Sequence, residues 1–307
     1  MASRSQGFSQ ESRRRRRDEV IAPRRFGADA ILYDQLGVNT PLECWGEGHG
    51  HPVPWYSHCE ERPGFVRRIV DEMHATDKDF AVFTEGLHDG ILDSIGMFHA
   101  SQPSSFMWDV NALKESRASR RANAEPFPEL FRYTFPELVT TTRNPTPMTL
   151  RSFVNYAAVF GLRHEIEIRY MPDRAYALDG KVPTKKDYGE VKNLPSLAAM
   201  HAEPPAIASA YMKAVGDFQR AHAKYLLRGT FVDDEGLAPV QSSLVAKRFV
   251  ADDGTSAVCV WNITGKPVPV EITGLGKPKG VFAPAGEGTT GPLAADSIRF
   301  YVFGDVK

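Results

Sequence analysis

Cysteine is scarce in this chain, and a long hydrophobic run or an excess of charge of one sign is missing. The 307 residues include three cysteines, 37 basic residues and 38 acidic residues, so the net charge is −1. A nearly neutral chain argues against a partner recognised mainly by charge, such as nucleic acid. No apolar stretch approaches the roughly 20 residues that cross a membrane, and a membrane partner is not expected.

The three cysteines cannot form a closed disulfide framework, although Cys44 and Cys59 could pair in an exported protein. Residues 1–25 are polar and carry an unbroken arginine run from 13 to 17. No apolar core follows these charges, so the segment does not read as a signal peptide. A solvated helix face is favoured for it over a targeting or nucleic-acid role. The compartment stays open.

A short buried strand that delivers a carboxylate to its end is the pattern on which the other predictions depend. Residues 30–33 are an apolar run typical of a parallel strand, and Asp34 and Gln35 follow at its end. Residues 80–83 repeat the design, with Glu85 at the strand end and His88 and Asp89 at the entry to the next loop. One such acid is as often a helix cap or an ion-pair partner as a catalytic group. Two such acids in consecutive strand–helix units favour a catalytic role.

Residues 65–76 have helical spacing and connect the two strands, which completes a βαβ unit. Such crossovers are right-handed and bring both strand ends to one edge. We therefore expect Asp34 and Glu85 to face one pocket.

Residues 38–64 form a long predicted loop rich in aromatic and imidazole side chains, which include Trp45, His49, His51 and Trp55. Indole faces stack on sugar rings and imidazoles hydrogen-bond hydroxyl groups, so one interpretation is a sugar-binding wall. The alternative is zinc, held among Cys44, His49, His51, His58 and Cys59. Their spacing matches no standard zinc site, so the sugar-binding wall is favoured and no metal is expected.

Predicted strands and helices alternate up to about residue 236, and short strands and turns follow. We predict helices at 89–98, 149–160 and 205–227 and a strand at 130–135. Glu137, Arg143 and Glu165 are secondary site candidates, although an arginine–carboxylate pair that holds loops together is the favoured role. Strands at 244–250, 257–263, 268–272 and 298–303, with a tight turn ending at Gly254, predict a small antiparallel β domain. The predicted domains are residues 26–236 and 237–307.

This order of elements resembles the glycoside hydrolases of the α-galactosidase-like barrel superfamily, most closely a branch known as a domain of unknown function. The resemblance rests on Gly27-Ala-Asp-x4-Asp34-Gln35-x-Gly37, Thr84-Glu85-Gly86 and Phe135-Pro-Glu-Leu138, and it spans roughly residues 20 to 300. It implies an α/β fold, a (β/α)8 TIM-type barrel followed by an antiparallel β-sandwich. It also implies that Asp34 is the nucleophile and Glu85 the proton donor.

A complete barrel needs eight strands, and only four or five are recognisable before residue 236. The expectation is therefore a partial barrel whose early strands are missing from this chain. Paired carboxylates suit glycoside hydrolysis because one meets the oxocarbenium-like carbon and the other protonates the leaving oxygen. We predict a retaining glycosidase with a carbohydrate substrate and no cofactor. The alternatives are a carbohydrate-binding or structural remnant and a metal-dependent hydrolase in which the acids hold Mg²⁺. The sugar, the linkage and the oligomeric state stay open.

Overall fold

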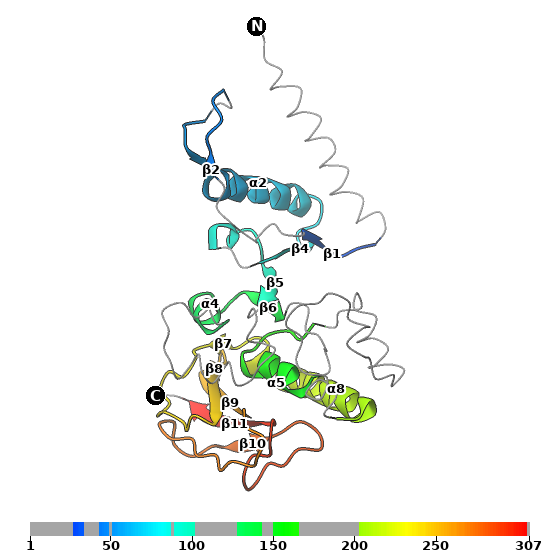
Figure 1. The fold of residues 1–307 in the computed structure, drawn as a ribbon, viewed down its shortest axis with the longest axis vertical. Coiled ribbons are helices and arrows are strands. Elements are labelled where there is room, and N and C mark those ends of the chain that lie inside the picture. Colours follow the sequence, from blue (N-terminus) through cyan, green and yellow to red (C-terminus); the bar gives the residue numbers. More distant parts are fainter. Residues whose placement is uncertain are drawn as a thin grey trace. The chain divides into compact units, whose positions relative to one another are not determined.

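The computed structural model describes residues 27–33, 43–48, 51–86, 89–101, 128–142, 150–165 and 203–305. The chain divides into two compact units, residues 1–100 and 101–307. Figure 1 labels the elements of both units. The domain boundary at residue 236 stays a prediction.

The first unit is built on parallel strands. Among its described residues, the elements are β1 (Ala30–Tyr33), β2 (Glu43–Cys44), β3 (Trp55–Tyr56), α2 (Ser57–His74), β4 (Ala81–Glu85), the 3-10 turn η1 (Asp89–Ile91) and β5 (Met97–Ser101). Strand β1 pairs with β4, and β4 pairs with β5, both in parallel. The β1–α2–β4 crossover confirms the βαβ unit that the sequence predicts. The described part of the unit shows parallel strands, while a closed barrel stays a prediction.

Helix α2 begins at Ser57, so the last eight residues of the predicted loop are helical, although Pro63 lies within them. Its buried side consists of Val66, Ile69, Val70 and Met73. This three-and-four spacing is the pattern from which the helix was predicted. Residues 43–56 carry the short antiparallel hairpin β2–β3 in place of an irregular loop.

The helix predicted at 89–98 is wrong, because the chain forms the short turn η1 and then strand β5. Ile91, Ile95 and Phe98 are almost fully buried and lie four and three residues apart. That spacing imitates a helical face. Gly90 and Gly96 lie within the segment and disfavour a helix over so few residues.

The first elements described in the second unit are α4 (Pro128–Thr134), β6 (Val139–Thr142) and α5 (Arg151–Val159). Residues 130–135 were predicted as a strand, and this prediction is wrong since α4 covers residues 130–134. Pro128 occupies the first helical position, which suits a residue without a backbone N–H. Buried Arg132 then donates to the carbonyl oxygens of Pro136 and Leu138, which fixes the chain after the helix.

The rest of the second unit is a sheet covered by helices. After α8 (Pro205–Ala221) and α9 (Ala223–Leu226) come β7 (Thr230–Phe231), β8 (Leu244–Val250), β9 (Thr255–Asn262), β10 (Gly280–Phe282) and β11 (Ile298–Asp305). These strands form one five-stranded antiparallel sheet in the order β10-β11-β9-β8-β7. The antiparallel prediction is confirmed, and so is the long helix, apart from a break at His222.

Helices α5, α8 and α9 pack on one face of this sheet, and α5 and α8 lie side by side in Figure 1. The core between them includes Phe153, Phe160, Phe218, Phe249 and Phe300. Loops cover the other face, which includes Val258, Val260 and Phe303. The structure thus has loops where a β-sandwich would have its second sheet. The strand predicted at 268–272 reduces to a single bridge between Val268 and Leu293.

Two glycines test how tightly this core is packed. Gly161 and Gly254 both have a left-handed backbone, with φ of +66° and +80°. A Cβ at Gly161 would lie 2.7 Å from Cε1 of Phe249, whereas a Cβ at Gly254 would meet nothing within 4 Å. We expect Gly254→Ala to cost about 1 kcal/mol of stability for its backbone alone. Gly161→Ala should cost about 1–3 kcal/mol more through overpacking.

The two variants are compared with the wild-type protein by urea unfolding. Equal losses for both would mean that the ring of Phe249 moves aside without cost, and that the core is looser than the structure shows.

Candidate active site

The carboxyl end of β4 and the middle of β5 bring two buried polar side chains together. Glu85 is the last residue of β4, and its register partner on β5 is His99. Their side chains are on the same face of a parallel sheet because they are register partners. Glu85 is 5% exposed and His99 is 8% exposed. A buried carboxyl beside a buried imidazole at a strand end is an arrangement suited to proton transfer.

Local sequence fixes this edge. Thr84 donates its hydroxyl to the carbonyl oxygen of Tyr33 at 3.0 Å, which ties the end of β1 to β4. Gly86 turns the chain away from the sheet with φ of +89°, a conformation that favours glycine. Its backbone N–H donates to the carbonyl oxygen of His99 at 3.2 Å. The Thr84-Glu85-Gly86 motif therefore ends the strand and sets Glu85 at its edge.

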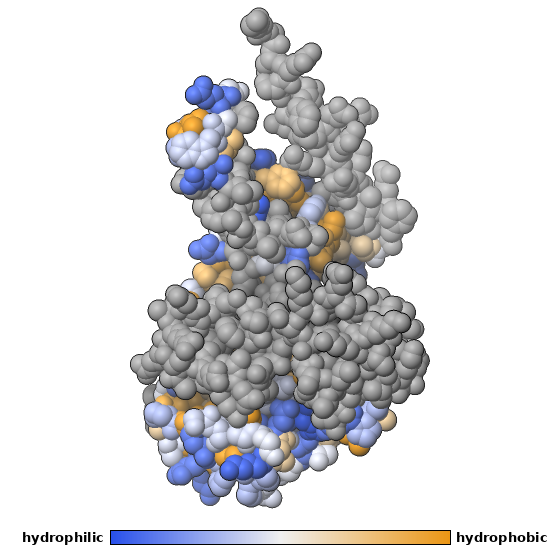
Figure 2. Space-filling model, viewed as in Figure 1, coloured by the Kyte–Doolittle hydropathy of each residue, from blue (hydrophilic) through white to orange (hydrophobic). Residues whose placement is uncertain are grey.

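The hairpin β2–β3 lies in the connection from the end of β1 to the start of α2, so it belongs to the same edge of the sheet as Glu85. Trp45 is 64% exposed, and its indole N–H donates to a carboxylate oxygen of Glu43 at 2.9 Å. The ring of His51 stacks on that of Trp55, with centroids 5.3 Å apart and planes 15° apart. Figure 2 shows this hairpin, at the upper left, as a mixture of hydrophilic and hydrophobic residues. It thus offers one exposed aromatic face and one stacked pair.

Several predicted residues lie elsewhere. Asp34, Gln35, His49, His88 and Arg143 are outside the described residues. Asp89 is exposed and begins η1, and Glu137 is exposed in the second unit. Glu165 is also in the second unit, where its backbone N–H donates to the hydroxyl of Thr142. His99 was not anticipated, because the segment before it was predicted to be a helix. The run from Met97 to Ala100 was the signal for a strand.

The described part of the chain contains no group of three or more histidine, cysteine, aspartate or glutamate side chains placed to hold a metal ion. Within it, no helix is long and apolar enough to cross a membrane.

The whole chain was compared with protein families, curated sequences and solved structures. No protein-family profile and no curated protein sequence matches the chain. Solved structures do match. Amy13B of Eubacterium rectale superposes with a TM-score of 0.60 at 12% identity, over 96% of this chain and 63% of that protein. The fold is glycosidase-like.

Two further solved structures agree with this fold. The trehalose-6-phosphate hydrolase of Bacillus licheniformis matches with a TM-score of 0.54 at 11% identity, over 96% of this chain and 69% of that one. The isomaltulose synthase of Protaminobacter rubrum matches with a TM-score of 0.52 at 9% identity, over 94% of this chain and 68% of that one. The present chain spans 63% of the length of the Eubacterium protein. The α-galactosidase-like branch stays a prediction.

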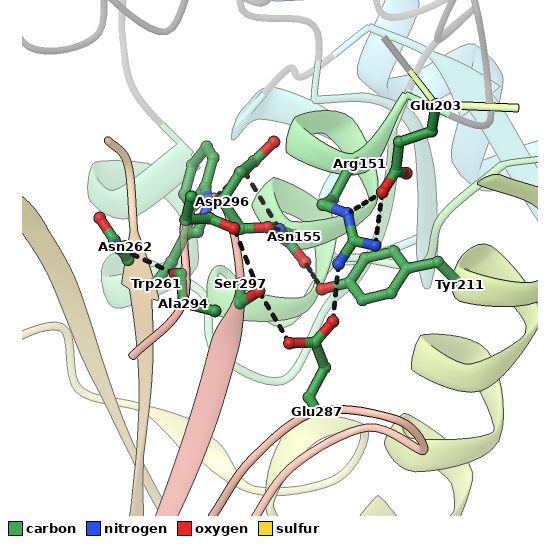
Figure 3. Close-up of polar contacts among 11 residues, drawn as sticks. Arg151, Asn155, Glu203, Tyr211, Trp261, Asn262, Glu287, Ala294, Asp296 and Ser297 are labelled. Carbon is green, nitrogen blue, oxygen red and sulfur yellow. Dashed lines mark hydrogen bonds and ion pairs between the residues drawn. The ribbon is translucent and has the colours of Figure 1, made fainter. Parts of the chain in front are cut away.

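A second buried polar cluster lies in the second unit, between its helices and the sheet (Figure 3). Asp296 accepts hydrogen bonds from the indole of Trp261 at 2.8 Å and from the amide of Asn155 at 3.2 Å. Asn155 in turn accepts from the hydroxyl of Tyr211 at 2.6 Å. Burial raises the pKa of Asp296, and the hydrogen bonds from Trp261 and Asn155 offset part of that rise.

Arg151 completes this cluster. Its guanidinium lies 3.6 Å from the ring centroid of Tyr211 and forms ion pairs of 2.7 Å with Glu203 and with Glu287. Burial alone would lower the pKa of Arg151, but its hydrogen bonds to the two carboxylates raise it. Ser297 donates to the second oxygen of Glu287. The cluster joins α5 and α8 to the loops of the sheet. Because each charged side chain in it has a hydrogen-bond or ion-pair partner, we assign it a structural role.

Asp296 gives a test of that structural role. Asp296→Ala removes the acceptor of the buried Trp261 N–H and should cost about 1–3 kcal/mol of unfolding free energy. Asp296→Asn keeps an acceptor oxygen and tolerates the φ of +43° at this position, so it should cost less.

The two variants should also differ from the wild type in their pH dependence. A carboxyl whose pKa is raised by folding contributes stability that is full below its unfolded pKa and is lost as the pH rises through the folded pKa. The stability of Asp296→Asn relative to the wild type should therefore rise with pH from 4 upward. Denaturant unfolding at several pH values measures this, and a difference that falls with pH would contradict the assignment.

Proposed function

We propose that this chain carries the catalytic carboxylates of a retaining glycoside hydrolase, with Asp34 as nucleophile and Glu85 as acid/base. The observation that carries the proposal is the buried Glu85 at the carboxyl end of a parallel strand in a glycosidase-like fold. Asp34 directly follows Tyr33 in the sequence, and Tyr33 is the register partner of Thr84, the residue before Glu85.

In the proposed reaction, a carboxylate oxygen of Asp34 attacks the anomeric carbon while Glu85 gives its proton to the departing glycosidic oxygen. Water then attacks the glycosyl–enzyme ester, and Glu85 takes the proton from that water. The double displacement retains the configuration of the anomeric carbon. It requires carboxyl groups about 5–5.5 Å apart, whereas an inverting pair needs about 6.5–9.5 Å.

Two variants separate the roles of the acids. Asp34→Ala removes the nucleophile, so even an aryl glycoside with a good leaving group should fail, while added azide should restore part of the turnover by attacking from the vacated space. Glu85→Ala removes only the proton donor. Turnover of natural sugars should fall about 10²–10⁴-fold, and aryl glycosides with good leaving groups should still glycosylate Asp34.

Asp93→Ala is the matched control, because Asp93 is an exposed acid of the same unit that pairs with Arg67. It should leave the rates unchanged. Wild-type rates in both Asp34→Ala and Glu85→Ala would show that the assignment is wrong.

A second candidate function is carbohydrate binding without turnover, and the exposed indole of Trp45 favours it. The hydrogen bond to Glu43 holds this ring in place, and a fixed aromatic face binds a pyranose at little entropic cost. Under both functions the hairpin is a sugar-binding surface. The absence of turnover by a chain that still binds oligosaccharides would select the second candidate.

Trp45 is the residue that tests this surface. Trp45→Ala should weaken the binding of pyranose oligosaccharides about tenfold, since a stacked ring contributes about 1 kcal/mol beyond its buried area. Trp45→Phe should lose less because it keeps an aromatic face. Tyr133→Ala, at another exposed aromatic residue in α4, serves as the control. Calorimetry should show unchanged affinity for Tyr133→Ala. An equal loss of affinity in both alanine variants would show that Trp45 has no specific role in sugar binding.

A further inference from the structure

The second unit contains a pocket of about 430 Å³ that is separate from the residues assigned above. It lies between α5, the residues that follow it, and the second half of α8. Its apolar lining consists of Val154, Met212, Val215 and Leu227. A pocket of this volume is in the range that holds a small organic molecule, and it is larger than an inorganic ion needs.

Among the described residues, the charged side chains that line this pocket are basic: Arg163, Lys213 and Arg220, with His164 beside them. Arg163 is the most buried of the three cations, and burial lowers its pKa. Its guanidinium donates from Nη2 to the carbonyl oxygen of Leu227 at 2.7 Å. No carboxylate in the described part of the chain forms an ion pair with it.

A second guanidinium strengthens the positive field. Arg132 is 5% exposed and donates only to carbonyl oxygens. Its pKa is lowered to about 10, first by burial and then by the positive charge of Arg163, while Glu137 acts in the opposite direction. The Nε of Arg132 is buried without a hydrogen-bond partner among the described residues. Buried Arg132 and partly buried Arg163 thus bring two like charges close together.

The rim on α8 adds two further cations. Lys213 and Arg220 both pair with Asp217, one helical turn away on either side. One carboxylate therefore serves two cations, and Arg163 adds a third. Among the described residues that line the pocket, an anion would meet three cationic side chains, two of which share the carboxylate of Asp217.

We propose that this pocket binds a small organic oxyanion, a phosphate or carboxylate group carried on an apolar body. The guanidinium of Arg163 has nitrogens other than Nη2 that suit the paired oxygens of such a group. Lys213 and Arg220 attract it at the entrance, and the apolar lining accepts the body. The proposal is independent of the glycosidase assignment, since none of these residues belongs to the candidate active site.

Titration calorimetry of the full chain tests the site with phenyl phosphate as the main probe. Benzoate distinguishes a carboxylate from a phosphate ligand, inorganic phosphate lacks the apolar body, and phenol lacks the charge. We expect saturable binding of phenyl phosphate or benzoate that is tighter than that of inorganic phosphate or phenol. Added salt should weaken it, because part of the attraction is between exposed charges.

Three variants locate the binding. Arg163→Gln should lower the affinity about tenfold or more, the usual effect of losing a charge-assisted hydrogen bond. The double variant Lys213→Gln with Arg220→Gln should lower it several-fold, and because both side chains are largely exposed this variant should fold even if Arg163→Gln does not. Gly216→Leu adds a side chain to the lining of the pocket and should block binding while all the charges remain.

Lys224→Gln is the control, because Lys224 is a partly exposed lysine near the end of the same helical region that pairs with Asp253 and does not line the pocket. It should bind as the wild type does. The proposal is overturned if no probe binds saturably, if phenol binds as tightly as phenyl phosphate, or if the double variant and Gly216→Leu both keep wild-type affinity.

Discussion

Parallel pairing of β1, β4 and β5 is the constraint from which the proposed chemistry follows. Parallel strands end at the same edge, so a sequence that repeats an apolar run and a polar residue gathers its polar groups there without long-range tuning. The hydrogen bond from Thr84 to Tyr33 fixes the relative height of two strands. The pairing of β4 with β5 makes Glu85 and His99 register partners, and the backbone N–H of Gly86 donates to the carbonyl oxygen of His99, so both side chains are buried near this edge.

Burial alone does not separate a catalytic group from a structural one in this chain. Glu85 and Asp296 are both buried carboxyls, and each lies next to a nitrogen-containing ring. Glu85 is the register partner of His99, and Asp296 accepts a hydrogen bond from Trp261. The difference is in the surroundings. Asp296 lies within a closed set of hydrogen bonds from Trp261 and Asn155 between helices and a sheet, whereas Glu85 ends a strand at the edge where βα connections leave the sheet. In α/β enzymes with parallel strands, catalytic groups commonly lie at the carboxyl ends of the strands.

Sequence-based prediction worked best where a periodic pattern of apolar residues extended over several turns or where a turn residue was decisive. Helix α5 before Gly161 and the hairpin at Gly254 are confirmed because each has such a signal, whereas strand β1 is confirmed from a four-residue apolar run alone. The errors occurred in short apolar segments. Ile91, Ile95 and Phe98 have helical spacing without being helical, and residues 130–135 have strand-like composition within α4. Such runs are too short for periodicity to decide, and tertiary burial decides instead.

The candidate site shows the same division between local and distant information. Glu85 was predicted because its signal is local: an apolar run, an acid and a glycine in succession. His99 was missed because its importance arises only from pairing with a strand that lies fourteen residues earlier in the chain. The stacking of His51 on Trp55 and the hydrogen bond from Trp45 to Glu43 depend on a hairpin that no sequence signal indicated.

Net charge illustrates what composition leaves out. A total of −1 argues against a partner attracted by the whole molecule, because fields of opposite sign cancel at a distance. Within a Debye length of about 8–10 Å the individual charges act separately. Arg132 and Arg163 lie close enough to lower one pKa, and Asp217 is shared between two cations on α8. A nearly neutral chain can therefore still gather several cationic side chains at one pocket, as Arg163, Lys213 and Arg220 do here.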